Sequence, residues 1–351
     1  MSLHSPSHAP QPPHGIQRAR ASAGFSLAET LVSTALTLIV LGTAVGALSD
    51  GVRLGDKTRR VADTNQGLQA ALALMVRDFI QTGHGIPAGG IPLPSGLGAV
   101  LVARPGPAGL TFPVDWQTVP SASPGAGLGP NVRGQATDLL NVISADATLA
   151  LSQWPLAAMA ADGSSMTVDA RTVVTGAGGL RAGDIILFSN AQGSALQMVT
   201  RTDQQIAYFE TGDPMHLNQR GAETGSVMAL RSGAVFPPTT ATRVVMVSYY
   251  IDAVTDSTWP RLVRQVNMGT PSAVALGVEN LQFSYDMVDG LTNPANVKQP
   301  ADENSANQIR KVNLFVAGRS PDMDQATHTY FRNAVATQVS LRSLSFVDRY
   351  R

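Results

Sequence analysis

The chain has 351 residues, and its 25 basic and 25 acidic side chains leave a formal net charge of zero. Because nucleic-acid-binding modules are usually strongly basic, this balance argues against a general nucleic-acid-binding protein. The absence of cysteine excludes disulfides, thiolate metal sites and thiol nucleophiles. With only 14% charged residues, 33 Gly and 22 Pro, the composition predicts a loop-rich protein.

Residues 1–24 are rich in Pro, His, Ser and Ala and show no apolar periodicity. We interpret them as a disordered leader.

An apolar stretch at about residues 27–48 has the ~20 residues that a helix needs to cross a membrane. Glu29 lies at its start, where plain anchoring does not require a carboxylate. At a helix centre a charge costs about 2.5–3.5 kcal/mol on insertion scales, so such residues usually have a function and a partner. Gly42 and Gly46 lie four residues apart, a spacing that allows close helix packing, although glycine is also frequent in membrane helices generally.

The run Gly24-Phe25-Ser26-Leu27-Ala28-Glu29, followed by the apolar helix, resembles the signal of type IV prepilins and pseudopilins. The resemblance implies that a prepilin peptidase cleaves after Gly24 and N-methylates Phe25. It also implies that Glu29 sets the filament register by meeting the terminal amine of a neighbouring subunit. The implied partners are this peptidase, other minor and major pilins, the inner-membrane assembly platform and membrane lipid.

Two other interpretations apply to the same residues: a secretory signal peptide, which would be removed whole, and a plain signal anchor. Neither explains Glu29. Arg18 and Arg20 precede the apolar stretch, but basic residues also follow it, so the charge bias does not determine orientation. The pilin resemblance implies a bacterial inner-membrane protein with its head in the periplasm, later carried to the pilus and cell surface.

Beyond the membrane stretch, the apolar residues recur at helical spacing and predict a stripe that lies on a core: Val61, Leu68, Leu72, Met75 and Phe79. A long helix over residues 25–83 is therefore expected, ended by the Gly and Pro residues that follow.

Residues 84–135 contain 11 Gly and 9 Pro. This content predicts an irregular segment with one strand at Ala99–Ala103, and long segments of this kind are often functional. We expect a subunit-specific surface here.

Residues 136–351 contain short alternating runs separated by turn residues, which predict an antiparallel β-rich head packed on the helix stripe. The expected fold class is therefore α+β, and Tyr249, Tyr250 and Trp259 are interpreted as packing residues. The predicted strands are Asp138–Ser144, Met166–Ala170, Asp184–Ser189, Leu196–Thr202, Gln205–Glu210, Val227–Arg231, Arg243–Ile251, Leu262–Val266, Leu281–Met287, Arg310–Ala317 and Val335–Leu341.

The carboxyl half resembles PilW-type minor pilins in the runs at residues 183–190, 281–286, 309–320 and 339–344. This narrower resemblance implies a minor pilin that primes assembly of a type IV pilus or lies near its tip. A minor pseudopilin of a type II secretion system, and a pilus-tip adhesin or DNA-uptake subunit, remain alternatives.

No catalytic or cofactor motif is found: the six histidines are scattered, and no nucleophile elbow or phosphate loop occurs. We therefore expect a protein that is not an enzyme and holds no metal or cofactor. Calcium binding remains an alternative at one oxygen-rich cluster, because loops of this kind can bind this ion. The same residue types are also ordinary in turns. The cluster consists of Asp286, Asp289, Asn293, Asp302 and Glu303.

Overall fold

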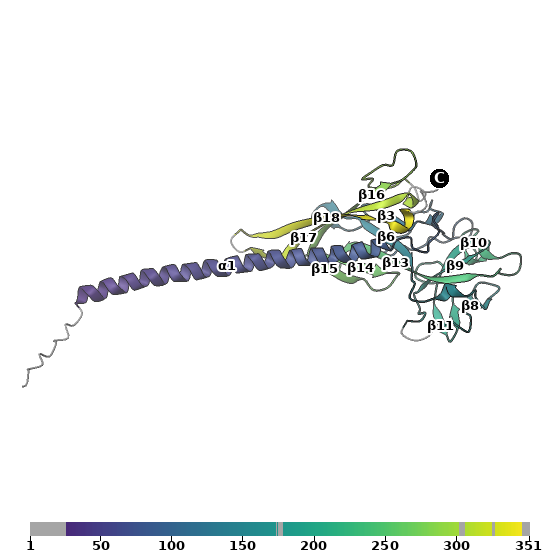
Figure 1. Cartoon of the computed structure of the whole chain (residues 1–351), viewed down its shortest axis with the longest axis horizontal. Coiled ribbons are helices and arrows are strands. Elements are labelled where there is room, and N and C mark those ends of the chain that lie inside the picture. Colours follow the sequence, from purple (N-terminus) through teal and green to yellow (C-terminus); the bar gives the residue numbers. More distant parts are fainter. Residues whose placement is uncertain (1–25, 173, 175–177, 302–305, 325–326, 346–351) are drawn as a thin grey trace, which may run out of the picture. The chain divides into compact units, whose positions relative to one another are not determined.

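The computed structural model describes residues 26–172, 174, 178–301, 306–324 and 327–345. The chain divides into two units, residues 1–57 and 58–351, and helix α1 (Leu27–Ile80) contributes to both. Antiparallel β-sheets follow α1 in the second unit, which confirms the α+β class (Figure 1).

The first part of α1 is fully exposed: from Ser26 to Arg59 no side chain is buried within the chain. By length and composition, α1 is the one helix of the described residues that could cross a membrane. The helix ends at Ile80, three residues before the predicted end, and a turn follows. Gly83 reverses the chain there: its φ of +80° favours glycine, and its N–H donates to the carbonyl of Ile143 at 2.9 Å.

The second part of α1 carries the predicted stripe. Leu68, Met75 and Phe79 are buried, and Leu72 is half-buried against them. The ring of Phe79 lies 5.7 Å from that of Tyr249 and 6.1 Å from that of Phe283, both in edge-to-face geometry. Tyr249 and Phe283 belong to different sheets, so the end of α1 is packed between the two sheets (Figure 1).

Tyr249 belongs to a seven-stranded sheet built around a long central strand, β13 (Thr240–Asp252). β13 pairs antiparallel with three other strands of the sheet, β6, β9 and β14. The other six strands are β3 (Ala122–Gly125), β6 (Leu139–Ala145), β9 (Ile185–Asn190), β10 (Gly193–Met198), β14 (Arg261–Val266) and β15 (Ser272–Leu276).

Phe283 belongs to a three-stranded antiparallel sheet of β16 (Val278–Met287), β17 (Ile309–Asp324) and β18 (Thr329–Ser340). Its buried side chains alternate along β17, as the sequence pattern predicts: Val312, Leu314 and Val316 face the core. The short helix α3 (Arg342–Ser345) follows β18.

A four-stranded sheet lies beyond the end of α1 in Figure 1 and contains β7 (Ala158–Met159), β8 (Ser165–Thr167), β11 (Arg201–Asp203) and β12 (Ile206–Tyr208). The predicted strand Leu196–Thr202 is divided between β10 and β11, which belong to different sheets. A 3-10 helix, η1 (Leu151–Gln153), precedes this sheet.

The Gly/Pro-rich segment 84–135 is mostly irregular but is not a detached loop. It takes part in two small two-stranded sheets and contributes β3 to the large sheet. One sheet pairs β1 (Ile91–Pro92) with β2 (Thr118–Val119), which lie far apart in the sequence. The other is a hairpin of β4 (Asn131–Val132) and β5 (Gln135–Ala136). Its apolar side chains Leu93, Val102 and Phe112 are buried against β6, β9, β10 and β13.

Two predicted strands are wrong. Val227–Arg231 forms a 3-10 helix instead, η2 (Val227–Leu230), because Val227 and Leu230, three residues apart, are both buried in the core around β8 and β9. Ala99–Ala103 is not a strand either; only Ala103 forms an isolated bridge, to Thr111.

Replacing Phe79 with Ala is expected to lower the free energy of unfolding by ~3–5 kcal/mol, because the cavity would open between two sheets that cannot both close over it. Chemical denaturation of the detergent-solubilised chain measures the change. The adjacent Ile80 is 38% exposed, so Ile80→Ala should cost much less and serves as the control. Equal losses in the two variants would contradict the proposed packing.

Candidate functional site

The N-terminal motif is described from Ser26 onward; the predicted cleavage and methylation residues, Gly24 and Phe25, lie outside the described residues. Ser26 and Glu29 form two reciprocal hydrogen bonds at the start of α1. The Ser26 N–H donates to Glu29 Oε2 at 3.0 Å, and the Glu29 N–H donates to Ser26 Oγ at 3.2 Å. This reciprocal pair is a capping box, which satisfies two N–H groups that a helix start otherwise leaves free.

The capping box gives Glu29 a local role within its own chain, beside the predicted role between subunits. Both residues are nevertheless exposed within the single chain. A carboxylate at this position is therefore still open to a cation from another molecule, and its role in filament register stays a prediction.

Gly42 and Gly46 lie one helical turn apart, and a methyl group at either position would meet nothing within 4 Å apart from its chain neighbours and the nearby helix backbone. The chain itself thus does not require glycine at these two positions. Packing against another helix and ordinary glycine frequency in membrane helices both remain consistent with this finding.

At the other end of α1, a buried carboxylate joins the helix to the large sheet. Asp78 Oδ2 accepts hydrogen bonds from the Tyr249 hydroxyl at 2.7 Å and from Arg264 Nε at 2.6 Å. Burial raises the pKa of Tyr249 well above its usual value, and the bond to Asp78 adds to the rise, so the phenol stays protonated and donates. Helix α1, β13 and β14 therefore meet at one charge-assisted network.

This network was not predicted from the sequence. Asp78 adjoins Phe79 on the helix and lies three residues after Met75, so a carboxylate within the apolar stripe was the available signal. No pattern in the sequence pointed to Tyr249 and Arg264 as its partners.

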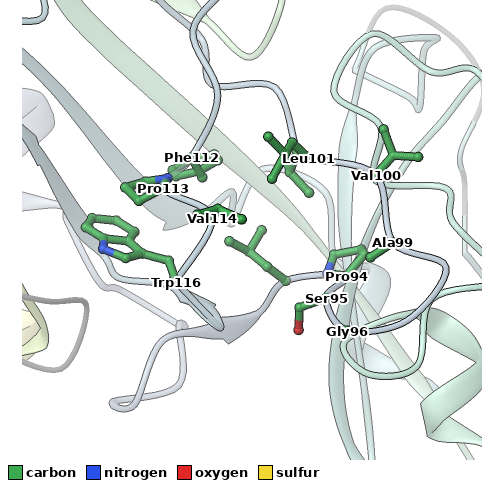
Figure 2. A pocket seen from close by; sticks show the side chains of 12 residues that line it. Pro94, Ser95, Gly96, Ala99, Val100, Leu101, Phe112, Pro113, Val114 and Trp116 are labelled. Atoms are coloured by element: carbon green, nitrogen blue, oxygen red, sulfur yellow. The ribbon is translucent and has the colours of Figure 1, made fainter.

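The irregular segment carries a small hollow of about 120 Å³, lined mostly by apolar side chains (Figure 2). Phe112, Pro113 and Trp116 lie on one side of it, and Ala99 and Val100 lie on the other. Val114, at the hollow, is 80% exposed. The predicted subunit-specific surface therefore has apolar side chains available for contact.

The acidic loop considered for calcium uses its described carboxylates locally. Asp289 accepts hydrogen bonds from the Thr292 hydroxyl and from the N–H groups of Leu291, Thr292 and Asn293. The bond from the Thr292 hydroxyl, followed by the backbone bonds, lowers the pKa of Asp289 strongly. Asp286 accepts from the side chains of Asn313 and Gln338. Asp302 and Glu303 lie outside the described residues.

Within the described ranges, no three His, Asp or Glu side chains come together as metal ligands. Trp259 is half-buried, and the guanidinium of Arg319 lies 5.3 Å from its ring centre, whereas Tyr249 and Tyr250 are buried, as predicted for packing residues.

Comparison of the chain with protein-family models, with curated proteins and with solved structures finds no match in any of the three. The pilin resemblance therefore depends on the run from Gly24 to Glu29 and on the runs in the carboxyl half.

Replacing Arg264 with Met is expected to lower the free energy of unfolding by ~3 kcal/mol, because it leaves the Asp78 carboxylate buried without its main cation. This loss is at the low end of the range usual for a broken buried ion pair, since the Arg264 side chain is 24% exposed and Arg77 Nη2 lies 3.5 Å from Asp78 Oδ1. Chemical denaturation measures the loss.

The matched control is the double variant Asp78→Asn/Arg264→Met, which removes both charges. It should be more stable than Arg264→Met alone by at least ~1 kcal/mol. A double variant no more stable than the single one would show that a stranded charge is not the cause.

Proposed function

We propose that this chain is a minor pilin: a structural subunit, without catalytic activity, that primes assembly of a type IV pilus or lies near its tip. The observation that carries the proposal is the run from Gly24 to Glu29 at the mouth of an apolar helix that continues into a β-rich head. The exposure of the helix over residues 27–57 supports it, because so much apolar surface needs lipid or other helices around it.

In this proposal the helix first anchors the protein in the inner membrane and later packs against other pilin helices. Glu29 pairs with the terminal amine of a neighbouring subunit. The head supplies surface contacts, for which Val100 and Val114 at the apolar hollow are available. A minor pseudopilin of a secretion system would use the same helix, and the resemblance of the carboxyl half favours the pilus.

The proposal predicts a mature protein that begins at Phe25 and carries an N-methyl group. Mass spectrometry of the N-terminal peptide, from cells with and without the prepilin peptidase, measures this directly. In peptidase-deficient cells the leader should remain attached. A mature start near Ser49 would mean that an ordinary signal peptidase removes the whole apolar stretch, and the pilin proposal would then be wrong.

Glu29→Ala and Glu29→Gln should both leave membrane insertion largely intact and reduce incorporation into pili. Removing one charge leaves the other unpaired in a poorly solvated helix bundle, a penalty of ~3–5 kcal/mol when fully buried. Immunoblots of sheared pili and co-purification with other minor pilins measure incorporation.

The capping box provides the control. Gln keeps an oxygen that can accept from the Ser26 N–H but has no charge, whereas Ser26→Ala breaks the cap and keeps the charge. If intersubunit pairing is the cause, Ser26→Ala should incorporate nearly normally and Glu29→Gln should not. The reverse pattern would assign Glu29 to capping alone.

A further inference from the structure

Arg104 is a buried cation in the irregular segment, with 2% of its surface exposed. Its Nε donates to Asn141 Oδ1 at 2.6 Å, and its Nη2 donates to the carbonyls of Ser123 at 2.6 Å and Pro124 at 2.8 Å. All three acceptors are neutral. Among the described residues, no carboxylate lies within 4.0 Å of this guanidinium.

A buried charge without a counter-ion is costly, and buried arginines are usually paired. Burial lowers the pKa of Arg104 to about 10, so the side chain still carries its charge at neutral pH. Nε has one hydrogen-bond acceptor and Nη2 has two, whereas Nη1 has none in the described part of the chain. The guanidinium thus has both charge and donors left for another group.

The partners of Arg104 are themselves held by further contacts. Asn141, which accepts from Nε, also donates to the carbonyl of Pro105 at 2.7 Å and to the Ser248 hydroxyl. The ring of Phe112 lies 5.6 Å from the guanidinium carbon. Because these partners belong to β6, β13 and the packed irregular segment, the position of Arg104 is set before any ligand arrives.

Arg104 lines a cavity of about 350 Å³, within the range of small-molecule sites. The other lining side chains are mostly apolar and include Leu101, Leu110 and Met268. His216 lies at the cavity with its Nδ1 3.2 Å from the carbonyl of Leu101. Arg104 is the one Lys or Arg among the lining residues, and no carboxylate lines the cavity.

We propose that this cavity binds a small organic carboxylate, with the carboxylate at Arg104 and its apolar group among Leu101, Leu110 and Met268. An anion supplies the missing countercharge, and Arg matches the planar fork of a carboxylate. The apolar lining favours an acid with a hydrocarbon or aromatic group over a small inorganic anion. This site is separate from the helix that carries the pilin proposal, so either proposal can fail without the other.

The test is a ligand-observed NMR titration of the full chain in detergent with sodium benzoate, at constant ionic strength. Benzamide has nearly the same shape and no charge. We expect benzoate to bind at least about 10-fold more tightly than benzamide, since hydrogen bonds to charged groups are stronger than neutral ones. Arg104→Lys, which keeps the charge, should bind benzoate more weakly than the wild type, and Arg104→Met should lose the preference.

A second pair of variants keeps the test decisive if Arg104→Met does not fold. Ala108 is exposed and lines the cavity, so Ala108→Trp should block it without touching the bonds of Arg104. Ala99 lines the neighbouring hollow and not this cavity, so Ala99→Trp is the matched control and should leave benzoate binding unchanged.

Absence of benzoate binding, equal binding of benzoate and benzamide, or equal loss in Ala108→Trp and Ala99→Trp would each overturn the proposal.

Discussion

The ring of Phe79 contacts aromatic rings of two different sheets, and much of the head depends on this placement. A helix can lie between two sheets only where its own side chains fill the space on both sides. Phe79 is large enough to reach Tyr249 on β13 and Phe283 on β16 at once. The next residue back, Asp78, points to the edge of the same interface and bonds to Tyr249 and Arg264. Apolar packing and a charge-assisted network therefore meet at consecutive helical positions.

The long strand β13 extends this arrangement to the rest of the head. Successive side chains of a strand face opposite sides, so Val247 and Tyr249 face the core around α1 while Val244 and Met246 face the core under the irregular segment. The strand thus lies between two separate cores, one on each face of the large sheet. A change at one face of β13 is expected to reach the other through the shared backbone.

The irregular segment shows why glycine and proline content alone does not define a loose loop. Its backbone forms few regular strands, yet Phe112 and Trp116 are buried, and Arg104 bonds to the backbone of β3. Side-chain bonds to carbonyls replace the ladder bonds that the irregular backbone lacks. The same arrangement leaves a buried cation without a carboxylate partner, and this imbalance supports the ligand proposal.

Local patterns in the sequence determined the long apolar helix, the stripe containing Leu68 and Phe79, and alternating strands such as β17, because each depends on neighbours within one or two turns. The same information predicted Glu29 as a site residue, since its position beside an apolar run is visible without a structure. The strand predicted at residues 227–231 was wrong. Val227 and Leu230, three residues apart, are both buried, and this run with strand propensity forms a 3-10 helix. Only the tertiary structure brought Asp78 to Arg264, 186 positions away, and enclosed Arg104 among neutral acceptors. Such contacts depend on how elements that are distant in the sequence pack together. The sequence around each residue does not indicate which residue it will contact.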